Sequence, residues 1–224
     1  MAMESYITRI RSIEKITHDV VRIQLGKPDG YTFIPGQATE VVINKDGWRE
    51  ERRPFTFTSL PHEDYLEFTI KTYPSHHGVT NELLTLRADD ELILHEVWGA
   101  ISYKGEGVFI AGGAGITPFL SIFRYLHAEN RMGNNRLIFA NKTSADIIQK
   151  EELEQMLGNN FINILSDENS AIYAHGLITE QFLRKNIPEP PGKFYVCGPP
   201  QMMDAIQQIL TKIGVSEDSV VVEL

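Results

Sequence analysis

Apolar and polar residues alternate with a period of two along the first half of the chain. A period of two is typical of β-strands that bury one face. The segments that show it, each bounded by turn residues, are Tyr6 to Ile13, Val20 to Leu25, Thr39 to Ile43, Arg53 to Ser59, Tyr65 to Tyr73 and Glu91 to Val97. About six such strands predict a small antiparallel β-barrel, with one short helix between Gly78 and Leu86.

The pattern changes after Trp98. Gly99 to Gly107 is predicted to be a short connector, and beyond it apolar runs of strand length alternate with segments of helical periodicity. The predicted strands are Val108 to Ala111, Arg136 to Ala140, Phe161 to Leu165, Lys193 to Cys197 and Val220 to Val222; the predicted helices are Thr117 to Ala128, Ser144 to Leu157, Thr179 to Lys185 and Pro199 to Ile213. Thr143 and Asp146 have the spacing of a capping box. This alternation predicts a doubly wound parallel sheet, so two domains are expected, residues 1–102 and 103–224.

A glycine-rich turn joins the first strand and the first helix of the second domain. The strand runs into Gly112, Gly113, Ala114 and Gly115, and Pro118 follows at the helix start. Glycines allow positive φ and close approach of a ligand to the backbone, and a helix N-terminus favours an anion. A dinucleotide pyrophosphate is therefore a candidate ligand, although glycine turns without a ligand are common in α/β proteins. The run lacks the Gly-Lys-Ser/Thr of a P-loop and the third glycine of the Rossmann fingerprint, so a nucleotide site here is of another kind.

Composition excludes several classes of function. The net charge of -9 argues against nucleic acid as a partner, and 42% hydrophobic residues are ordinary for a globular protein. The one cysteine, Cys197, excludes intramolecular disulfides, cysteine-based zinc sites and a bound iron–sulfur cluster. Adjacent His76 and His77 would point apart on an extended segment, so no metal site is expected. No apolar run reaches the roughly 20 residues of a membrane span and no signal peptide is recognisable, so a cytoplasmic protein is expected.

A short motif in the fourth predicted strand is a second candidate for ligand chemistry. Arg53 lies among apolar and hydroxyl residues, and Phe55, Thr56 and Ser59 follow it. An isolated Arg in such a strand is usually a solvated residue on the polar face. Here the strand period places Arg53, Phe55 and Phe57 on one face, where an Arg can bind phosphate bidentately and an aromatic ring can lie on a flat ligand. Thr56 would offer its hydroxyl and its backbone N–H.

Five motifs, in this order along the chain, resemble those of the ferredoxin–NADP reductase superfamily. Arg-x-aromatic-Ser/Thr-x-x-Ser is its flavin motif, and Cys-Gly-Pro-Pro-x-Met is found near the end of its second domain. The matching segments are Phe33 to Gln37, Arg53 to Ser59, Gly78 to Asn81, Gly112 to Pro118 and Cys197 to Met202. The resemblance covers the whole chain. It implies that the β-barrel of residues 1–102 binds FAD and that the α/β domain of residues 103–224 binds NAD(P).

The resemblance also implies a role for individual residues. Arg53 would bind the flavin pyrophosphate, Phe55 would pack on the flavin, and Thr56 would approach its N5 edge. Thr56 and Cys197 would lie closest to the reacting atoms. The cofactor-binding residues that it implies are Arg53, Pro54, Phe55, Thr56, Ser59, Thr69, Ile70, Lys71, Gly78, Val79 and Thr80 for the flavin, and Gly113, Gly115, Thr117, Pro118, Asp167, Cys197, Gly198 and Pro199 for the nicotinamide nucleotide.

The stretch after the third strand of the second domain bears on the choice between NADH and NADPH. Members of the superfamily that use NADP often have Ser-Arg there, whereas this chain has Ser166, Asp167 and Glu168. Two carboxylates would repel a 2′-phosphate, and an acid can accept a hydrogen bond from a ribose hydroxyl, so NADH is favoured over NADPH. Lys142 could supply an opposing positive charge.

The activity implied by the resemblance is hydride transfer from NAD(P)H to FAD, followed by electron transfer to a separate soluble protein. Ferredoxin, flavodoxin and a haem or oxygenase component are the candidate acceptors, and a monomer is expected. Two alternatives stay open: a free-flavin reductase that releases its product, and a flavin-binding redox sensor or regulatory subunit without turnover.

Overall fold

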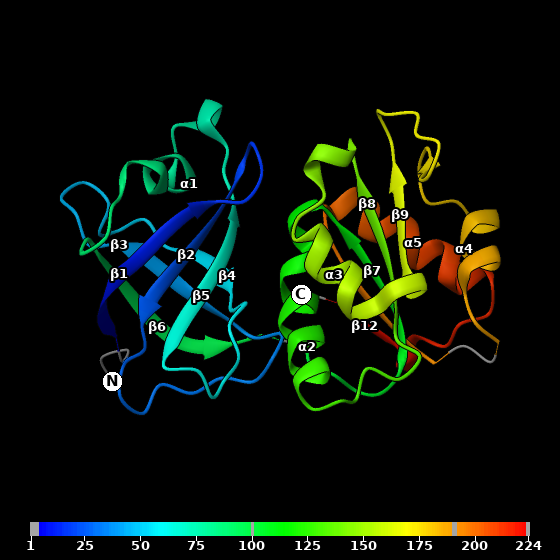
Figure 1. Ribbon diagram of the computed structural model, residues 1–224, viewed down its shortest axis with the longest axis horizontal. Coiled ribbons are helices and arrows are strands. Elements are labelled where there is room, and N and C mark those ends of the chain that lie inside the picture. Colours follow the sequence, from blue (N-terminus) through cyan, green and yellow to red (C-terminus); the bar gives the residue numbers. More distant parts are fainter. Residues whose placement is uncertain (1–4, 100, 190–191, 223–224) are drawn as a thin grey trace. The chain divides into compact units, whose positions relative to one another are not determined.

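The computed structural model describes residues 5–99, 101–189 and 192–222 of the chain. It separates into two compact units, Met1–Ser102 and Tyr103–Leu224. Each unit has its own six-stranded sheet (Figure 1), and the two are described in turn.

The first unit is a nearly closed antiparallel barrel, as the alternation predicted. The strand order is β4-β3-β6-β1-β2-β5, and the isolated bridge between Phe57 and Phe68 joins the two outer strands, β4 and β5. The strands are β1 (Tyr6–Lys15), β2 (Val20–Gly26), β3 (Ala38–Ile43), β4 (Arg53–Thr56), β5 (Tyr65–Lys71) and β6 (Glu91–Trp98).

Alternate side chains of the strands fill the barrel. Ile23 and Leu25 of β2 are buried in the same cluster as Leu66 and Phe68 of β5. The predicted helix after β5 is divided into α1 (Val79–Glu82) and a 3₁₀ turn, and it follows another 3₁₀ turn; these turns are η2 (Leu83–Thr85) and η1 (Pro74–His76). Val79 of α1 and Leu83 of η2 belong to the same core, so this segment packs on the barrel.

The fourth strand ends earlier than predicted. β4 stops at Thr56 because the chain changes partner at Phe57. The N–H of Phe57 still donates to the Gln37 carbonyl at 3.1 Å, but the N–H of Thr58 donates to the Glu67 carbonyl of β5 at 2.8 Å. The prediction of one strand from Arg53 to Ser59 is therefore wrong at its C-terminal end.

The second unit is a parallel sheet in the order β10-β9-β8-β7-β11-β12, which confirms the predicted doubly wound fold. Its strands are β7 (Gly107–Gly112), β8 (Arg136–Asn141), β9 (Phe161–Leu165), β10 (Ala174–His175), β11 (Lys193–Cys197) and β12 (Val220–Val222). Its helices are α2 (Thr117–Ala128), α3 (Lys150–Leu157), α4 (Glu180–Asn186) and α5 (Pro200–Lys212), with the 3₁₀ turns η3 (Gly113–Ile116), η4 (Ser144–Asp146), η5 (Gly158–Asn160) and η6 (Glu217–Ser219).

Helices cover both faces of this sheet. On one face, the ring of Phe109 in β7 lies 4.7 Å from that of Phe123 in α2. On the other, Val108 of β7 shares a core cluster with Leu183 of α4 and Ile206 of α5. Because both faces are covered, the central strands are apolar throughout instead of alternating.

Tyr195 of β11 fixes the start of this unit. Its ring stacks on Phe109 at 4.1 Å between centroids, and its hydroxyl donates to the Gly105 carbonyl at 2.7 Å while accepting the Lys104 N–H at 2.8 Å. Burial raises the pKa of Tyr195 to about 12, so the phenol remains a donor at neutral pH.

The helix predicted from Ser144 to Leu157 is interrupted. Only the turn η4 and the later helix α3 are helical, and Gln149 between them has a left-handed φ of 53°. Ile147 and Ile148 are both buried. The chain leaves the helix at Ile147, whose φ of −71° and ψ of 103° are extended, and it reaches α3 through the left-handed Gln149.

Two smaller features complete the comparison of elements. Thr143 and Asp146 form the predicted capping box, although it caps only η4. The two-residue strand β10 was not predicted, because it is too short to show a period. The other predicted strands and helices agree with the structure to within two residues at each end, and the turns η3, η5 and η6 were not predicted.

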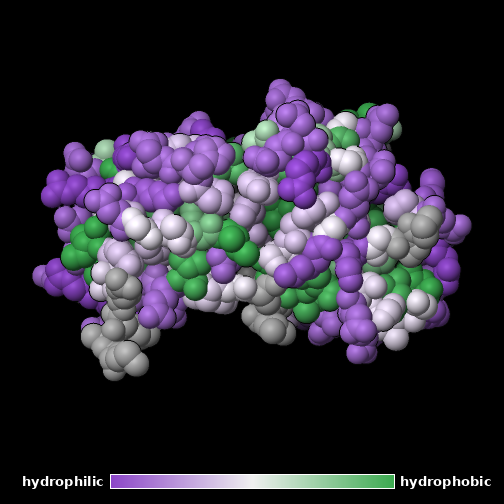
Figure 2. All heavy atoms as spheres, turned by 90° about the horizontal axis from the view of Figure 1, so that it is seen from below, coloured by the Kyte–Doolittle hydropathy of each residue, from purple (hydrophilic) through white to green (hydrophobic). Residues whose placement is uncertain are grey.

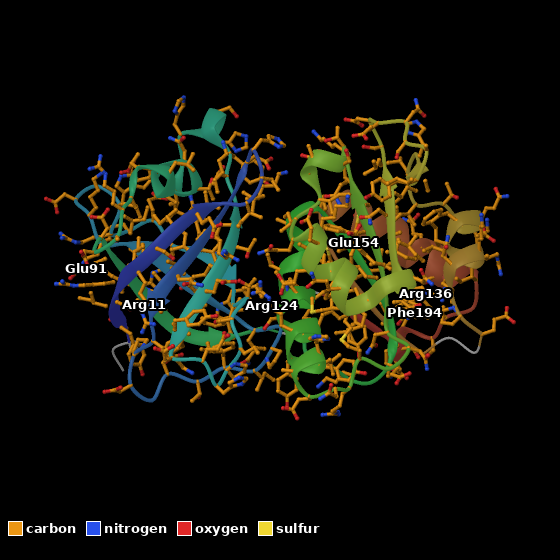
Figure 3. All side chains as sticks on the ribbon, viewed as in Figure 1. Arg11, Glu91, Arg124, Arg136, Glu154 and Phe194 are labelled. Atoms are coloured by element: carbon orange, nitrogen blue, oxygen red, sulfur yellow. The ribbon has the colours of Figure 1, made fainter. Side chains whose placement is uncertain are left out.

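Hydrophilic residues cover much of the face seen in Figure 2. Charged side chains such as Arg11 and Glu154 are exposed, whereas Phe194 of β11 is buried in the core of its unit (Figure 3). Within the described residues, no helix combines the length and the apolar character that crossing a lipid bilayer requires.

Candidate functional site

The bridge between Phe57 and Phe68 joins β4 to β5, and beyond it the backbone groups of the two strands are not paired with each other. Thr56 lies on the same side of the bridge as Thr69, because antiparallel strands run past it in opposite directions. The N–H of Phe57 points to Gln37, so by alternation the N–H of Thr56 points away from β3 and toward β5. Pro54, two residues earlier, has no N–H to leave unpaired. This edge of the barrel therefore offers a backbone donor at Thr56, which is 8% exposed.

Arg53 begins β4 with an accessible guanidinium. Its side chain is 46% exposed, and it donates to the Arg52 carbonyl at 2.6 Å and to the Glu51 carboxylate at 3.1 Å. Both partners are chain neighbours on an exposed segment, so a phosphate can replace them. Phe55, two residues on, is partly buried with its ring 6.3 Å from that of Phe68. Arg53 and Phe55 thus remain available to a ligand.

Other predicted residues contribute backbone or shape instead of side-chain contacts. Phe57, expected on the same face as Arg53, is fully buried with its ring 4.3 Å from that of Phe33. Ile70 and Val79 are also buried in the barrel core. Their side chains stabilise the barrel wall against which a ligand at this edge would lie.

Lys71, at the end of β5, is held by an acid that the sequence did not single out. Asp19, between β1 and β2, places its Oδ2 2.7 Å from the Lys71 Nζ. Thr72 fixes this turn by donating to the Asp19 carbonyl through its N–H at 2.7 Å and its hydroxyl at 3.0 Å. Partial burial opposes ionisation of Asp19, but the hydrogen bond and the charge of Lys71 outweigh it and lower the pKa of that carboxyl. Asp19 therefore positions the Lys71 ammonium.

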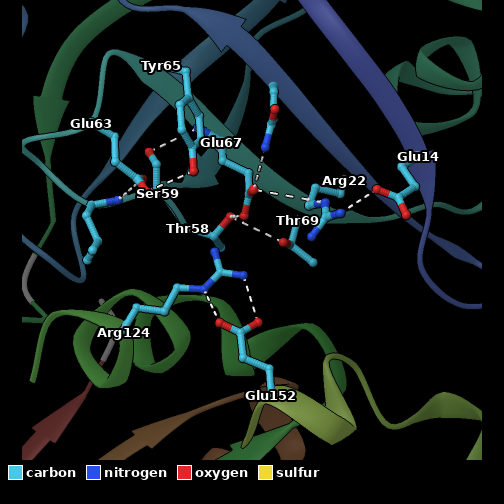
Figure 4. A network of polar contacts seen from close by, with 12 residues as sticks. Glu14, Arg22, Thr58, Ser59, Glu63, Tyr65, Glu67, Thr69, Arg124 and Glu152 are labelled. Atoms are coloured by element: carbon cyan, nitrogen blue, oxygen red, sulfur yellow. Dashed lines mark hydrogen bonds and ion pairs between the residues drawn. The ribbon is translucent and has the colours of Figure 1, made fainter. Parts of the chain in front are cut away.

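A second acid, Glu67, organises a polar network on the same strand (Figure 4). Its carboxylate accepts the Thr58 hydroxyl at 2.9 Å and the Gln24 amide at 3.2 Å, and the hydroxyls of Thr58 and Thr69 are 3.2 Å apart. The N–H of Glu67 donates to the Ser59 hydroxyl at 3.0 Å, so Ser59 is a structural member of this network. The sequence signal was an acid within the apolar and hydroxyl residues of β5.

The turn before α1 is open. A Cβ on Gly78 would meet no atom within 4 Å. The Thr80 hydroxyl accepts the N–H of Tyr73 at 3.3 Å and so links this turn to the end of β5. An accessible guanidinium, the polar edge at Thr56, a partly exposed ring and an open glycine turn are the features that a flavin nucleotide requires. The residues of the barrel therefore fit this cofactor.

In the second unit, β7 and β11 end next to each other, paired as far as Ala111 and Cys197. The two glycines that follow β7 differ in what surrounds them. Gly113 has a φ of +51°, and a Cβ on it would meet no atom within 4 Å, so its backbone is open to a ligand. A Cβ on Gly115 would lie 2.3 Å from the Cys197 carbonyl oxygen. Gly115 is therefore needed for packing against β11, and Gly113 gives access.

The remaining predicted residues lie around these two turns. The Thr117 hydroxyl donates to the Ala114 carbonyl at 3.1 Å at the start of α2, and Pro118 is buried behind it. Cys197 is 2% exposed, with its carbonyl against Gly115. Pro199 is exposed at the start of α5. The fold thus brings both glycine motifs together at one edge of the sheet, although they are far apart in sequence.

Asp167 lies at the same edge, two strands away. Its N–H donates to the Lys142 carbonyl at 2.9 Å, and its exposed carboxylate accepts the Ser166 hydroxyl at 2.6 Å. Glu168 behaves otherwise: its carboxylate accepts the N–H of Ser144 at 2.8 Å and the Ser144 hydroxyl at 2.9 Å. The expectation that both carboxylates are available is therefore wrong for Glu168, which is bound by Ser144. The Asp167 carboxylate accepts a bond from its chain neighbour Ser166 and remains exposed.

The spacing along this edge fits a dinucleotide. Strands lie about 4.8 Å apart, so the end of β9 is about 10 Å from the end of β7. The open backbone at Gly113 begins η3, which leads into α2, and neither element has a side-chain cap on its first N–H groups. A phosphate is favoured at such a helix start, and a ribose hydroxyl can donate to Asp167.

Comparison with known proteins assigns each unit to a family. The FAD-binding domain family matches residues 5–96, and the oxidoreductase NAD-binding domain family matches residues 109–208. In solved structures, the flavohaem-like FAD/NAD-binding domain of nitric oxide dioxygenase from Vibrio cholerae superposes with a TM-score of 0.85 at 19% identity, covering 96% of each chain. At that identity, the likeness supports the fold.

Two curated relatives extend over nearly the whole chain. The reductase component of propane 2-monooxygenase from Rhodococcus jostii is 31% identical over 234 residues, covering 95% of this chain and 61% of that protein. NADH-cytochrome b5 reductase 2 of Mycosarcoma maydis is 26% identical over 253 residues, covering 94% of this chain and 70% of that protein. The chain therefore spans less than two thirds of the length of the first of these relatives.

Proposed function

The chain belongs to the ferredoxin–NADP reductase superfamily, and we propose that it is a flavoprotein reductase that takes a hydride from NADH onto bound FAD and passes the electrons to a separate acceptor protein. In this proposal residues 1–102 bind FAD and residues 103–224 bind the nicotinamide nucleotide. The observation that carries it is the presence in one chain of two complementary features. One is the accessible Arg53 guanidinium together with the open turn at Gly78, and the other is an open glycine turn at Gly113.

When bound, FAD supplies the hydride acceptor and the means to release electrons one at a time. The protein provides binding and orientation. Arg53 pairs with the pyrophosphate, Phe55 packs on the ring system, and Thr56 donates to the flavin edge. Lys71, held by Asp19, places a fixed positive charge at the end of β5. No side chain needs to act as a strong acid or base, because holding the two cofactors in the reactive geometry supplies the rate enhancement.

NADH is the proposed electron donor. The exposed Asp167 carboxylate repels a 2′-phosphate and accepts a ribose hydroxyl. The name of the Mycosarcoma maydis relative, an NADH-cytochrome b5 reductase, supports the same choice.

The proposed acceptor is a soluble haem protein or oxygenase component, with ferredoxin and flavodoxin as further candidates. Support comes from the relatives, which are named as a monooxygenase reductase component and as a cytochrome b5 reductase. With one cysteine, the 224 residues hold no cysteine-ligated cluster of their own, so in this proposal the electrons pass from FAD directly to the acceptor protein. We also propose a cytoplasmic monomer, for which size-exclusion chromatography coupled to light scattering is the test of mass.

Anaerobic reduction tests the proposal. The purified chain is expected to retain FAD, to be bleached faster by NADH than by NADPH, and to be reoxidised by a cytochrome b5-type haem protein or an oxygenase component. Saturable reduction of free flavin with loss of bound FAD would identify a free-flavin reductase instead. Bleaching without reoxidation by any carrier would identify a sensor, and a protein that binds no flavin would overturn the proposal.

A further inference from the structure

One side chain covers both glycine turns at the ends of β7 and β11. Met202 lies in the first turn of α5, with its N–H bonded to the Pro199 carbonyl at 2.9 Å. A Cβ on Gly112 would lie 2.6 Å from the Met202 sulfur, and one on Gly198 would lie 2.8 Å from the Met202 methyl carbon. Real Cβ atoms essentially never approach other atoms so closely. The thioether therefore occupies the space that the missing side chains of both glycines leave.

The two turns also touch each other beneath this side chain. A Cβ on Gly198 would lie 3.1 Å from the Gly112 nitrogen and 3.2 Å from its Cα. Met202 thus lies across the line where the backbones of the two turns meet. A Cβ on Gly113, the residue after Gly112, would meet no atom within 4 Å. The Met202 side is filled by protein, and the Gly113 side is left for a ligand.

Methionine suits this position for physical reasons. Its side chain is unbranched and flexible, so one residue can contact two backbone segments. Met202 is partly buried and packs against the same core cluster as its neighbour Met203, which anchors its stem. Alanine would lose the contacts to both turns, and a branched side chain of similar volume would reach them less well.

We propose that Met202 is a positioning residue of the nicotinamide nucleotide site. It holds the Gly112–Gly113 turn and the Gly198–Pro199 turn at the separation that the nucleotide needs. This inference rests on the proposed function, since it assumes that the nucleotide binds at these turns. Met202 acts through the backbone of the turns, and its sulfur takes no part in the redox chemistry.

The test uses the full chain loaded with FAD and measures anaerobic flavin reduction over a range of NADH concentrations. This separates the Kd for NADH from the limiting rate, and FAD content and melting temperature are recorded for each variant. Met202→Ala is expected to raise the Kd about tenfold, equivalent to ~1.4 kcal/mol, and to leave FAD content unchanged. Met202→Leu keeps a similar volume and is expected to raise the Kd by about threefold.

Met203→Ala is the matched control, because it removes the same side chain from the next position of α5 and from the same core cluster. Its Kd for NADH is expected to remain within about twofold of that of the original protein. An equal rise in Kd for Met203→Ala would show that Met202 contributes only general packing of α5, and it would overturn the proposal. An unchanged Kd in Met202→Ala would also overturn it. If the alanine variant fails to fold, an unchanged Kd in Met202→Leu overturns it equally.

Gly113→Val separates this inference from the function on which it rests. Valine at a φ of +51° would place a branched side chain in the space assigned to the nucleotide. Loss of reduction by NADH, with FAD retained, is expected. Normal reduction of Gly113→Val by NADH would show that the nucleotide does not bind at this edge, and it would contradict the proposed function. A defect in Gly113→Val with none in Met202→Ala would contradict only the role of Met202.

Discussion

Replacing Gly115 with alanine tests how the nucleotide turn is built. The new methyl group would lie 2.3 Å from the Cys197 carbonyl oxygen and 2.5 Å from its carbonyl carbon. Both are backbone atoms, so the turn or β11 must move by about 1 Å to restore ordinary contact at 3.4 Å. Overpacking of this kind costs about 1–3 kcal/mol. In a chain of this size, 1 kcal/mol lowers the melting temperature by about 2–4 °C, so a decrease of roughly 2–12 °C is expected.

Thermal unfolding of the FAD-saturated protein, followed by circular dichroism, measures this effect. Gly113→Ala is the control in the same turn: it meets no atom within 4 Å, so its cost is the left-handed backbone alone, about 1–2 kcal/mol. The Gly113→Ala variant should lose NADH affinity, and its loss of stability should not exceed about 2 kcal/mol. A melting temperature of Gly115→Ala equal to that of the original protein would refute the close packing of this turn against β11.

Three further predictions concern charged residues. Arg53→Ala should weaken FAD binding by roughly 10- to 100-fold, because a charge-assisted hydrogen bond contributes about 1.5–3 kcal/mol, and full retention of FAD after dialysis would contradict the assignment. Asp19→Asn should destabilise the protein at neutral pH. The folded-state pKa of Asp19 is lowered from 3.8, so its stabilisation is present above pH 3.8 and is lost as the pH falls through the lower folded value. The free energies of unfolding of Asp19→Asn and of the original protein, measured in urea, should converge as the pH falls through that range. A difference that stays constant with pH would show that the ion pair with Lys71 is not the cause. Asp167→Arg should narrow the preference of kcat/KM for NADH over NADPH by roughly 30-fold, since it removes a repulsion and adds an attraction, each of about 1 kcal/mol in water at about 4 Å. An unchanged ratio of kcat/KM for NADH to that for NADPH would show that another residue, such as Lys142, determines the choice of nucleotide.

The elements that the sequence predicted well are those whose pattern is local. Alternation along β2 follows from one buried face, and the apolar runs of β7 and β11 follow from burial on both faces. Prediction failed where the outcome depends on a distant partner. β4 ends at Thr56 because Phe57 is the point at which the chain turns from β3 to β5.

The break before α3 has a similar origin. Thr143 and Asp146 correctly signalled a helical start, but Ile147 and Ile148 are both required in the core. At Ile147 the backbone becomes extended, so the chain leaves the helix, and it resumes the helix after Gln149. Nothing local in the sequence indicates that both isoleucines are needed inside.

The sequence by itself determined the chemistry of the two candidate sites: an Arg with an aromatic ring and a hydroxyl on one strand, and glycines between a strand and a helix. These are residue types whose capacity to bind an anion or a flat ring does not depend on their neighbours. Only the tertiary structure decided what positions them. Asp19 holds Lys71, Met202 fills the space beside two glycines, and Glu168 is bound by Ser144 instead of facing a ligand. The contacts of Asp19 with Lys71, of Met202 with Gly112 and of Glu168 with Ser144 join residues from different elements. The packing of the fold decides which of these residues meet, and no local pattern in the sequence indicates it.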